Sequence, residues 1–381
     1  MNKNNIPFAN LHAQYLKYQV EIDTAISRVL HAGQFIMGPE VKELEEKLSQ
    51  FLGGDVYTVA CASGTDALML ALLGIDIEPG DEVITTPFTF IATVEVISLL
   101  GAKPIFVDIE PDTLNIDASK IEEKITARTK AIIPVSLYGQ TADMDAINEI
   151  ASSASKKIGR EIFVIEDGAQ SFGAEYHGKK SCTLSKLACT SFFPAKPLGC
   201  YGDGGAVFTT DEALARKMKC LSAHGQTQRY HHEYIGINGR LDTLQAAVLL
   251  AKLPHYLEEI KRRQEIAVKY NELLSKEKEI AITTIRKDRT SVYAQYTIRL
   301  KQRDKLKSAL EKNGIPTAIH YPKPLHLQPC FSSYGFKEGD FPLAEQAAKE
   351  VLSLPMCAFL DREKQGFIGE TLLREVGVEV E

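Results

Sequence analysis

Apolar positions near the start of the chain recur at helical spacing and predict two amphipathic helices. The apolar face of the first helix is made of Ile22, Ile26, Val29 and Leu30. The apolar face of the second is made of Val41, Leu44, Leu48 and Phe51. The pair Gly53-Gly54 follows directly and is predicted to end the second helix, because glycine readily takes the backbone conformation that terminates helices.

From residue 55 onward the pattern changes to short runs rich in β-branched and aromatic residues. The predicted strands span 81–86, 104–109, 131–137, 161–167, 188–193 and 206–210. Helical segments at 92–100 and 142–155 separate the earlier runs. Nearly continuous apolar strands that alternate with helices indicate an α/β fold, with a mostly parallel sheet covered by helices on both faces.

A long amphipathic stretch, predicted as a linking helix over about 254–277, divides the chain into two domains. Its charged residues are interpreted as the solvated side of the helix rather than as a polyanion site. Beyond it, a strand-like segment at 291–300 and a helix at 305–314 indicate a smaller α+β domain. We therefore expect a large domain over 1–254 and a small C-terminal domain over 255–381.

Composition narrows the class of protein. The chain has 381 residues, of which 44% are hydrophobic and 25% charged, and its formal net charge of −6 argues against proteins that coat nucleic acid or an anionic membrane. The seven cysteines include no CxxC pair, so we expect no disulfide framework and no zinc site, and a reducing cytoplasm fits best. No apolar run approaches the roughly 20 residues of a membrane span, and the N-terminus lacks the apolar segment of a secretory signal.

The strand ends hold the candidate chemistry, since open α/β sheets bind ligands beyond the carboxyl ends of their strands. Ser63, Gly64 and Thr65 follow one strand and open a helix, where free N–H groups and the helix dipole suit a phosphate. A simple helix cap is the alternative interpretation of these residues. No P-loop is present and no GxGxxG opens a βα unit, which disfavours an ATPase or a nicotinamide dehydrogenase.

Two charged residues follow two later strands. Asp167 ends a hydrophobic strand, so its carboxylate is expected to be desolvated and to need a cation, such as a protonated pyridine nitrogen. The alternative is a carboxylate that caps the next turn. Lys196 lies in a Pro/Gly-rich segment after another strand, where desolvation makes an amine nucleophilic. A salt-bridged structural lysine is the alternative there.

The order of these signals is more informative than any one of them. A phosphate loop, an aromatic residue (Phe88 or Phe90), Asp167 and then Lys196 form the layout of a fold-type I, aspartate aminotransferase-like, pyridoxal phosphate enzyme. The segments PFTFIAT, IEDGAQSFGA, SFFPAKPLGCYGDGGAVFTT and GINGRLDTLQAAVLLAKL resemble the DegT/DnrJ/EryC1/StrS family of nucleotide-sugar aminotransferases. The resemblance runs almost end to end. It implies pyridoxal 5'-phosphate as the cofactor and transamination as the reaction.

The resemblance also implies roles for individual residues. Lys196 matches the Schiff-base lysine, Asp167 the partner of the pyridine nitrogen, and Gln170 the residue beside the 3-oxygen of the cofactor. Phe90 matches the aromatic residue that stacks on the ring. The implied phosphate ligands are Gly64, Thr65 and Ser191, with Asn238 reaching the phosphate from the neighbouring subunit of a homodimer. Some family members have histidine at the lysine position and perform dehydration, so Lys196 favours transamination.

Within the family, ASGTDAL, IPVSLYGQTADMDAI and SFFPAKPLGCYGDGGA are most similar to enzymes that transfer an amino group from L-glutamate to C3 of UDP-2-acetamido-2-deoxy-3-oxo-D-glucuronate, for bacterial O-antigen. Arginine can bind both oxygens of a carboxylate, so Arg229 is the candidate for the uronate. A diphosphate contact and a surface salt bridge are its alternative roles. His320 and Tyr321 are further substrate candidates, with a structural role as the alternative. The histidines of HGQTQRYHH have no usual metal-ligand spacing, and we expect no metal site.

Two other functions are compatible with the sequence. An aminotransferase that acts on a C4-keto sugar carrying a different nucleotide would share all of these motifs. A nucleotide-sugar-binding or regulatory protein that had lost catalysis would share the fold, but intact Lys196 and Asp167 argue against it.

Overall fold

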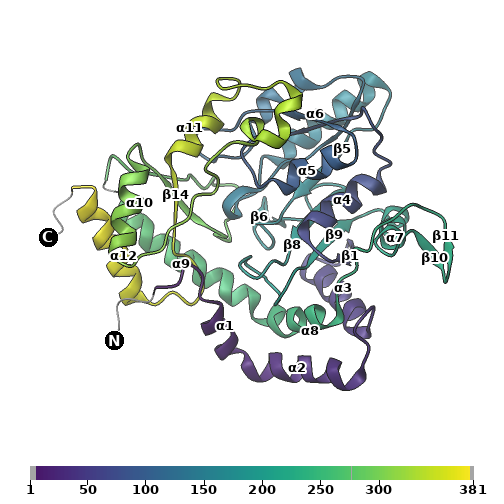
Figure 1. Ribbon diagram of the computed structural model, residues 1–381, viewed down its shortest axis with the longest axis horizontal. Coiled ribbons are helices and arrows are strands. Elements are labelled where there is room, and N and C mark those ends of the chain that lie inside the picture. Colours follow the sequence, from purple (N-terminus) through teal and green to yellow (C-terminus); the bar gives the residue numbers. More distant parts are fainter. Residues whose placement is uncertain (1–5, 276, 378–381) are drawn as a thin grey trace.

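The computed structural model describes residues 6–275 and 277–377, and its centre is a seven-stranded sheet (Figure 1). In spatial order the strands are β1 (Tyr57–Cys61), β9 (Gly205–Thr209), β8 (Leu187–Ser191), β5 (Phe163–Asp167), β4 (Thr129–Ile132), β2 (Glu82–Thr85) and β3 (Lys103–Phe106). β9 runs antiparallel to both of its neighbours, and the other pairings are parallel. The prediction of an α/β fold with a mostly parallel sheet is therefore confirmed.

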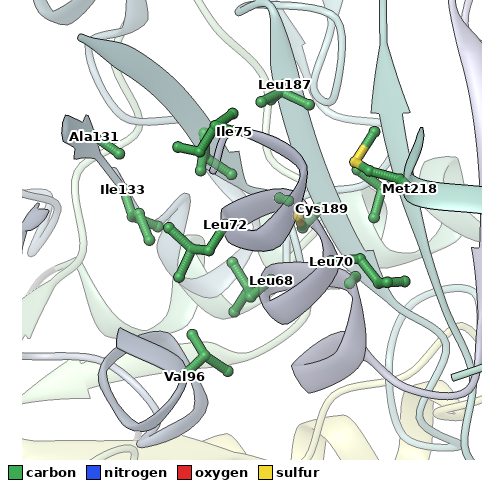
Figure 2. Packing of buried hydrophobic residues seen from close by; sticks show 14 of the residues in the cluster. Leu68, Leu70, Leu72, Ile75, Val96, Ala131, Ile133, Leu187, Cys189 and Met218 are labelled. Carbon is green, nitrogen blue, oxygen red and sulfur yellow. The ribbon is translucent and has the colours of Figure 1, made fainter. Parts of the chain in front are cut away.

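Helices cover both faces of this sheet. They are α3 (Pro39–Phe51), α4 (Gly64–Gly74), α5 (Ala92–Leu99), α6 (Met144–Ile158), α7 (Glu212–Leu221) and α8 (Thr243–Lys252). α4, α5 and α7 share one buried cluster with alternate strand residues, to which they contribute Leu70, Val96 and Met218 (Figure 2). α3, α6 and α8 pack on the opposite face. Both faces of the sheet are thus covered by helices, and the carboxyl ends of its strands are the place expected for a ligand.

Local sequence signals set where these helices begin and end. The hydroxyl of Ser63 caps α4 by accepting a hydrogen bond of 3.0 Å from Asp66 N. Asp143 caps the start of α6, and Gly159 ends that helix in the left-handed conformation with φ of 70°. Such caps bind the terminal N–H groups that have no partner within the helix.

Two N-terminal helices, α1 (Leu11–Lys17) and α2 (Gln19–Ala32), precede the sheet. α2 lies against α8 (Figure 1). Ile22 and Val29 are buried as predicted, but Leu30 is 56% exposed, so the expectation that it shares the buried face is wrong. The stripe of α2 that meets Val248 of α8 is narrow, and Leu30 falls outside it.

A smaller unit surrounds a three-stranded antiparallel sheet. Its strands are β12 (Ala281–Ile282), β13 (Tyr296–Arg299) and β14 (Val351–Leu354), and its helices are α9 (Tyr256–Leu274), α10 (Arg303–Lys312), α11 (Pro342–Glu350) and α12 (Arg362–Glu375). α9 contributes to two cores, because Tyr256 and Ile260 pack with α3 and α8 while Ile266 and Tyr270 pack with the smaller sheet. Ile6 also lies in the smaller core, so the first described residues pack with the C-terminal part of the chain.

Short elements complete the chain. They are the hairpins β6–β7 (Glu175–Tyr176, Lys179–Lys180) and β10–β11 (Gln226–Gln228, His231–His232), and the 3-10 turns η1 (Ala118–Lys120), η2 (Glu122–Lys124), η3 (Leu137–Gly139), η4 (Leu253–His255), η5 (Leu325–Leu327) and η6 (Pro329–Tyr334). The hairpin β10–β11 extends beyond α7 at the right of Figure 1. No helix in the described ranges is long and apolar enough to cross a membrane.

Candidate active site

Asp167 ends β5 and points to the face of the sheet that α4 and α5 cover. Side chains alternate between the faces of a strand, and Ile165, two residues earlier, lies in the cluster of that face. Asp167 is 4% exposed; its Oδ2 accepts a hydrogen bond of 2.9 Å from Thr93 Oγ1, and its Oδ1 accepts one of 3.2 Å from Ala169 N. Burial raises the pKa of Asp167, whereas these hydrogen bonds and the charge of Lys196 act against the increase. The carboxylate of Asp167 is therefore held in one orientation, but its negative charge is only partly compensated by its neighbours.

Lys196 lies in the tight segment that follows β8. Its backbone N–H donates to Phe193 O at 2.8 Å, and Cys200 N donates to Phe192 O at 2.8 Å. Gly199 makes this turn possible, since a Cβ there would lie 2.5 Å from Pro194 O. Desolvation lowers the pKa of Lys196 to about 8, although the negative charge of Asp167 opposes the change. The amine is consequently a nucleophile at a pH close to neutral.

The start of α4 offers an anion site. The first N–H groups of a helix have no partner within it, and here they belong to Gly64 and Thr65. A Cβ on Gly64 would lie 2.6 Å from Ser191 Cβ, so the end of β8 closes against the start of this helix. The structure thus brings Gly64, Thr65 and Ser191 together. This arrangement of N–H and hydroxyl groups suits a phosphate, because it adds donors to the positive end of the helix dipole.

Gln170 is held at both ends of its carboxamide. Its Oε1 accepts a hydrogen bond of 2.7 Å from Tyr138 N, and its Nε2 donates one of 3.2 Å to the hydroxyl of Tyr321. The hydroxyl of Tyr138 donates to the carbonyl oxygen of His320. Residues from the smaller unit therefore meet the turn that carries Gln170.

His320 and Tyr321 lie beside the charged pair. Nδ1 of His320 is 2.9 Å from Ser353 Oγ, and burial together with the charge of Lys196 lowers the pKa of His320 to about 4. Burial and the charge of Asp167 raise the pKa of Tyr321. Both side chains are thus neutral at neutral pH. Because Gln170 donates a hydrogen bond to the Tyr321 hydroxyl and His320 directly precedes Tyr321, the two residues belong to the same site.

The two aromatic candidates differ in exposure. Phe88 is fully buried, with its ring centroid 6.5 Å from that of Tyr321. Phe90 is 54% exposed, and its ring lies 6.0 Å from that of Tyr321 at an interplanar angle of 39°. Phe90 is therefore the one whose ring is accessible to a ligand, which is consistent with the role that the resemblance implied for it.

Asn238 and Arg229 lie outside the cluster that one chain forms. Asn238 is exposed and accepts a hydrogen bond of 2.8 Å from Arg240 Nη2, and the adjacent Gly239 O accepts from Ala62 N near the start of α4. Arg229 lies in the exposed turn between β10 and β11, with its guanidinium carbon 5.2 Å from the centroid of the Tyr230 ring. The roles of Asn238 and Arg229 stay predictions.

Two residues at this site were not singled out by the sequence. Thr93 lies within PFTFIAT, but no local pattern pairs a helical threonine with a carboxylate 74 residues later. Tyr138 follows β4, so attention to every strand end would have identified it as a candidate.

The residues of this site match the chemical groups of pyridoxal phosphate. A buried carboxylate that lacks an ion-pair partner in the described ranges suits a protonated ring nitrogen. The amine of Lys196, the open start of α4 and the exposed ring of Phe90 supply the other contacts that such a cofactor needs. Within 6–275 and 277–377 no group of three His, Cys, Asp or Glu side chains is arranged to hold a metal ion.

Comparison with known proteins agrees with this chemistry. The sequence profile of the DegT/DnrJ/EryC1/StrS aminotransferase family matches residues 17–373. The chain is 52% identical over 356 residues to the UDP-2-acetamido-2-deoxy-3-oxo-D-glucuronate aminotransferase of Pseudomonas aeruginosa, which covers 93% of this chain and 96% of the relative. It is 45% identical over 370 residues to the pleiotropic regulatory protein of Geobacillus stearothermophilus, with 97% and 98% of the two chains covered. The crystal structure of S. venezuelae DesV in complex with a ketimine intermediate matches with a TM-score of 0.93 and 39% identity, over 99% of each chain.

Proposed function

The chain belongs to the DegT/DnrJ/EryC1/StrS aminotransferase family, and from this premise we propose that it transfers the amino group of L-glutamate to C3 of a UDP-linked 3-keto sugar. Like the family, the protein is a pyridoxal-phosphate-dependent aminotransferase. The proposed sugar is UDP-2-acetamido-2-deoxy-3-oxo-D-glucuronate, which is the substrate in the name of the relative from Pseudomonas aeruginosa. The observation that carries the chemistry is the combination of the half-buried amine of Lys196 with the buried carboxylate of Asp167.

Each residue of the cluster has a defined task. Pyridoxal phosphate, when bound, supplies an aldehyde that takes up the amino group and a ring that withdraws electrons. The N–H groups of Gly64 and Thr65 hold its phosphate. The carboxylate of Asp167, fixed by Thr93, keeps its ring nitrogen protonated. The Nζ atom of Lys196 moves the proton at the reacting carbon, and a pKa of about 8 allows it both to accept and to release that proton near neutral pH.

The amine of Lys196 serves as the proton carrier for both substrates in turn. L-Glutamate would be the amino donor and would leave as 2-oxoglutarate, and the keto sugar would be the acceptor of the amino group in the second half-reaction. A single site that serves two half-reactions predicts ping-pong kinetics. The neutral side chains of His320 and Tyr321 line the site where the sugar would bind, and as neutral groups they can give hydrogen bonds to its hydroxyls and carbonyl.

A homodimer with shared active sites is part of the proposal. Phe35, Ile36 and Met37 are 45%, 51% and 50% exposed, and Phe193, close to Lys196, is 52% exposed. Large exposed apolar side chains of this kind are typical of surfaces that a second copy covers. A second copy would also explain why Asn238 and Arg229 are exposed, since each would serve the site of its partner: Asn238 at the phosphate and Arg229 at the uronate carboxylate.

We place the reaction in the cytoplasm, on the route to the O-antigen of bacterial lipopolysaccharide. The seven cysteines all carry free thiols, which is typical of a reducing compartment. Nucleotide sugars and L-glutamate are cytoplasmic metabolites of the kind that the proposed reaction consumes. Neither nucleic acid nor a membrane is proposed as a partner.

A panel of nucleotide sugars tests this function. The holoenzyme is first converted with L-glutamate, which should bleach its yellow colour, and is then offered three acceptors: the UDP-linked 3-keto uronate, the matching sugar with CH2OH in place of the carboxylate, and a dTDP-linked C4-keto sugar. We expect the colour to return fastest with the 3-keto uronate. Preference for the C4-keto sugar would assign a different aminotransferase. No bleaching with L-glutamate would favour a regulatory role, as the name of the Geobacillus stearothermophilus relative suggests.

A further inference from the structure

Tyr138 contacts both sides of the site, although the chemistry above gives it no task. It lies in η3, the next element after β4, and is 4% exposed. Its backbone N–H donates to Gln170 Oε1 at 2.7 Å, while its hydroxyl donates to the carbonyl oxygen of His320. Gln170 Nε2 donates in turn to the hydroxyl of Tyr321 at 3.2 Å. The four residues form a closed ring, which we call the Tyr138 ring.

The backbone at Tyr138 is firmly held. Its φ of 58° lies in the left-handed region, which is uncommon for a residue with a side chain. Asn115 Oδ1 accepts a hydrogen bond of 2.9 Å from Leu137 N on one flank. On the other flank Gly139 has a φ of 114°, and a Cβ there would lie 2.6 Å from Tyr293 N. The direction of the Tyr138 N–H group and that of its side chain are therefore fixed together.

The N–H group of Tyr138 decides the orientation of the Gln170 carboxamide. Only the oxygen of a carboxamide can accept a hydrogen bond from a backbone N–H group, so the NH2 group must face Tyr321. The Tyr321 oxygen accepts there and keeps its own hydrogen for another acceptor. Because burial and the charge of Asp167 raise the pKa of Tyr321, its phenol retains that hydrogen.

We propose that Tyr138 is a positioning residue that keeps His320 and Tyr321 in register with Gln170, so that in the enzyme without substrate the hydroxyl of Tyr321 donates its hydrogen to the cofactor. The hydroxyl of Tyr138 is used by the His320 carbonyl and acts only through these neighbours. The inference rests on the proposed function for the identity of the sugar, but its test needs only the cofactor and no sugar.

The test uses Tyr138→Phe, which removes the hydroxyl contact to His320 and retains the N–H contact to Gln170. Tyr334→Phe is the matched control, because Tyr334 OH also joins the C-terminal part of the chain to α5, at 2.9 Å from Ser98 Oγ, and makes no hydrogen bond to the ring within the described ranges. Tyr321→Phe and the double variant Tyr138→Phe/Tyr321→Phe complete a cycle. The measurement is the visible absorbance of the bound cofactor as a function of pH, with no substrate present.

The hydroxyl of Tyr321, as a hydrogen-bond donor, stabilises the anionic form of the cofactor. Loss of this donor should therefore raise the pKa of the spectral transition by roughly half a unit, which is about threefold in the proton equilibrium. We expect similar shifts in Tyr138→Phe and Tyr321→Phe, no larger shift in the double variant, and none in Tyr334→Phe. A wild-type transition in Tyr138→Phe, or shifts that add in the double variant, would overturn the proposal.

A second variant covers the case in which Tyr138→Phe does not fold. In Gln170→Glu the carboxylate accepts from both Tyr138 N–H and the Tyr321 hydroxyl, so Tyr321 has no hydrogen left for the cofactor. Adding Tyr321→Phe should then leave the transition where Gln170→Glu puts it. A further shift of the transition when Tyr321→Phe is added to Gln170→Glu would contradict the role of the Tyr138 ring. Failure of every nucleotide sugar to react would refute the proposed substrate without changing any of these spectra.

Discussion

The hydroxyl of Thr93 donates a 2.9 Å hydrogen bond to Oδ2 of Asp167, from the first turn of α5 to the end of β5. Thr89 Oγ1 lies 3.1 Å from Thr93 Oγ1 and extends the contact back toward the exposed ring of Phe90. The carboxylate is thereby oriented by neutral donors, and its charge stays available for a cation. A preorganised charge of this kind stabilises a positive ring nitrogen without the cost of moving dipoles during the reaction.

Asp167→Asn should therefore slow catalysis far more than it weakens cofactor binding. The amide cannot stabilise a protonated ring nitrogen, and we expect a loss of about 3 kcal/mol in barrier terms, which corresponds to roughly a hundredfold in kcat. The variant Thr93→Ala retains the charge of Asp167 and loses only the hydrogen bond that orients it, so its loss in kcat should be nearer to tenfold. Steady-state rates and cofactor occupancy measure both effects. A near-normal rate in an Asp167→Asn enzyme that holds its cofactor would contradict the role.

The difference between Asp167 and Thr93 explains how far the sequence could lead. A carboxylate at the end of a hydrophobic strand is a local pattern, and so is a lysine in a Pro/Gly-rich segment. Thr93 becomes a partner only when α5 packs beside β5, and its position 74 residues before Asp167 carries no trace of that contact. The sequence thus pointed to Asp167 and Lys196 as candidates, whereas Thr93, which orients the Asp167 carboxylate, could be found only in the structure.

The sequence does not predict the hairpin β10–β11, for a related reason. Its residues, including Gln226, Gln228 and His232, lack the alternation of apolar and polar side chains that marks a strand packed on a core. The pairing depends instead on backbone hydrogen bonds and on a turn at Tyr230, whose φ of 65° is left-handed. Leu30 is an example of the opposite error: the helical spacing of apolar residues predicts that it is buried, but no element among the described residues covers it.

The lowered pKa of Lys196 predicts how the apoenzyme takes up pyridoxal phosphate. Only the neutral amine attacks the aldehyde, and with a pKa of about 8 the neutral fraction is about a tenth at pH 7 and about a hundredth at pH 6. The rate at which the apoenzyme recombines with the cofactor should rise about tenfold per pH unit up to pH 8 and then level off. Stopped-flow absorbance measures this rate.

The variant Lys196→Ala tests the role of the amine itself. It should fold, show no lysine-linked absorbance and have no turnover. Full transamination by this variant would remove Lys196 from the mechanism.

Glu166 predicts a pH dependence of stability. It is fully buried on β5, where its carboxyl accepts hydrogen bonds from Ser181 Oγ at 2.6 Å and Cys182 N at 2.8 Å, and burial raises its pKa to about 7. A folded pKa above the unfolded value means that the contribution is fully present below about pH 4.5 and is lost as pH rises through 7. The free energy of unfolding from denaturant titration should therefore lose up to about 3 kcal/mol over this window.

Glu166→Gln isolates that contribution. The amide cannot titrate and resembles the neutral carboxyl, so the variant should differ from the wild type least at pH 5 and most at pH 8, where the wild type holds a buried carboxylate. An unchanged slope of stability against pH in Glu166→Gln would mean that another group titrates in this window.

A shared active site predicts complementation between inactive subunits. Lys196→Ala removes the amine, and Asn238→Asp places a negative charge where the phosphate of the partner would bind. Mixed under conditions of subunit exchange, the two variants should form heterodimers in which one site contains neither substitution. Activity should return toward half of the wild-type value per heterodimer. No recovery despite exchange shown by mass labelling, or a fully active monomer, rules out the shared site.

Arg229 predicts specificity for the acid sugar. A buried carboxylate needs a charged partner that can give it two hydrogen bonds, and Arg229 is an exposed arginine whose recorded contact in the described ranges is the ring of Tyr230. Arg229→Leu should weaken catalysis with the 3-keto uronate by about 2–4 kcal/mol, because the carboxylate would be left uncompensated, and should barely change the rate with the CH2OH sugar or with L-glutamate. Arg216→Leu is the control variant, because Arg216 is also an exposed arginine but lies on α7; this substitution should change the rate with neither sugar. The comparison of kcat/KM for the two sugars decides the outcome: equal losses would make Arg229 a diphosphate contact, and no loss with either sugar would remove it from the site.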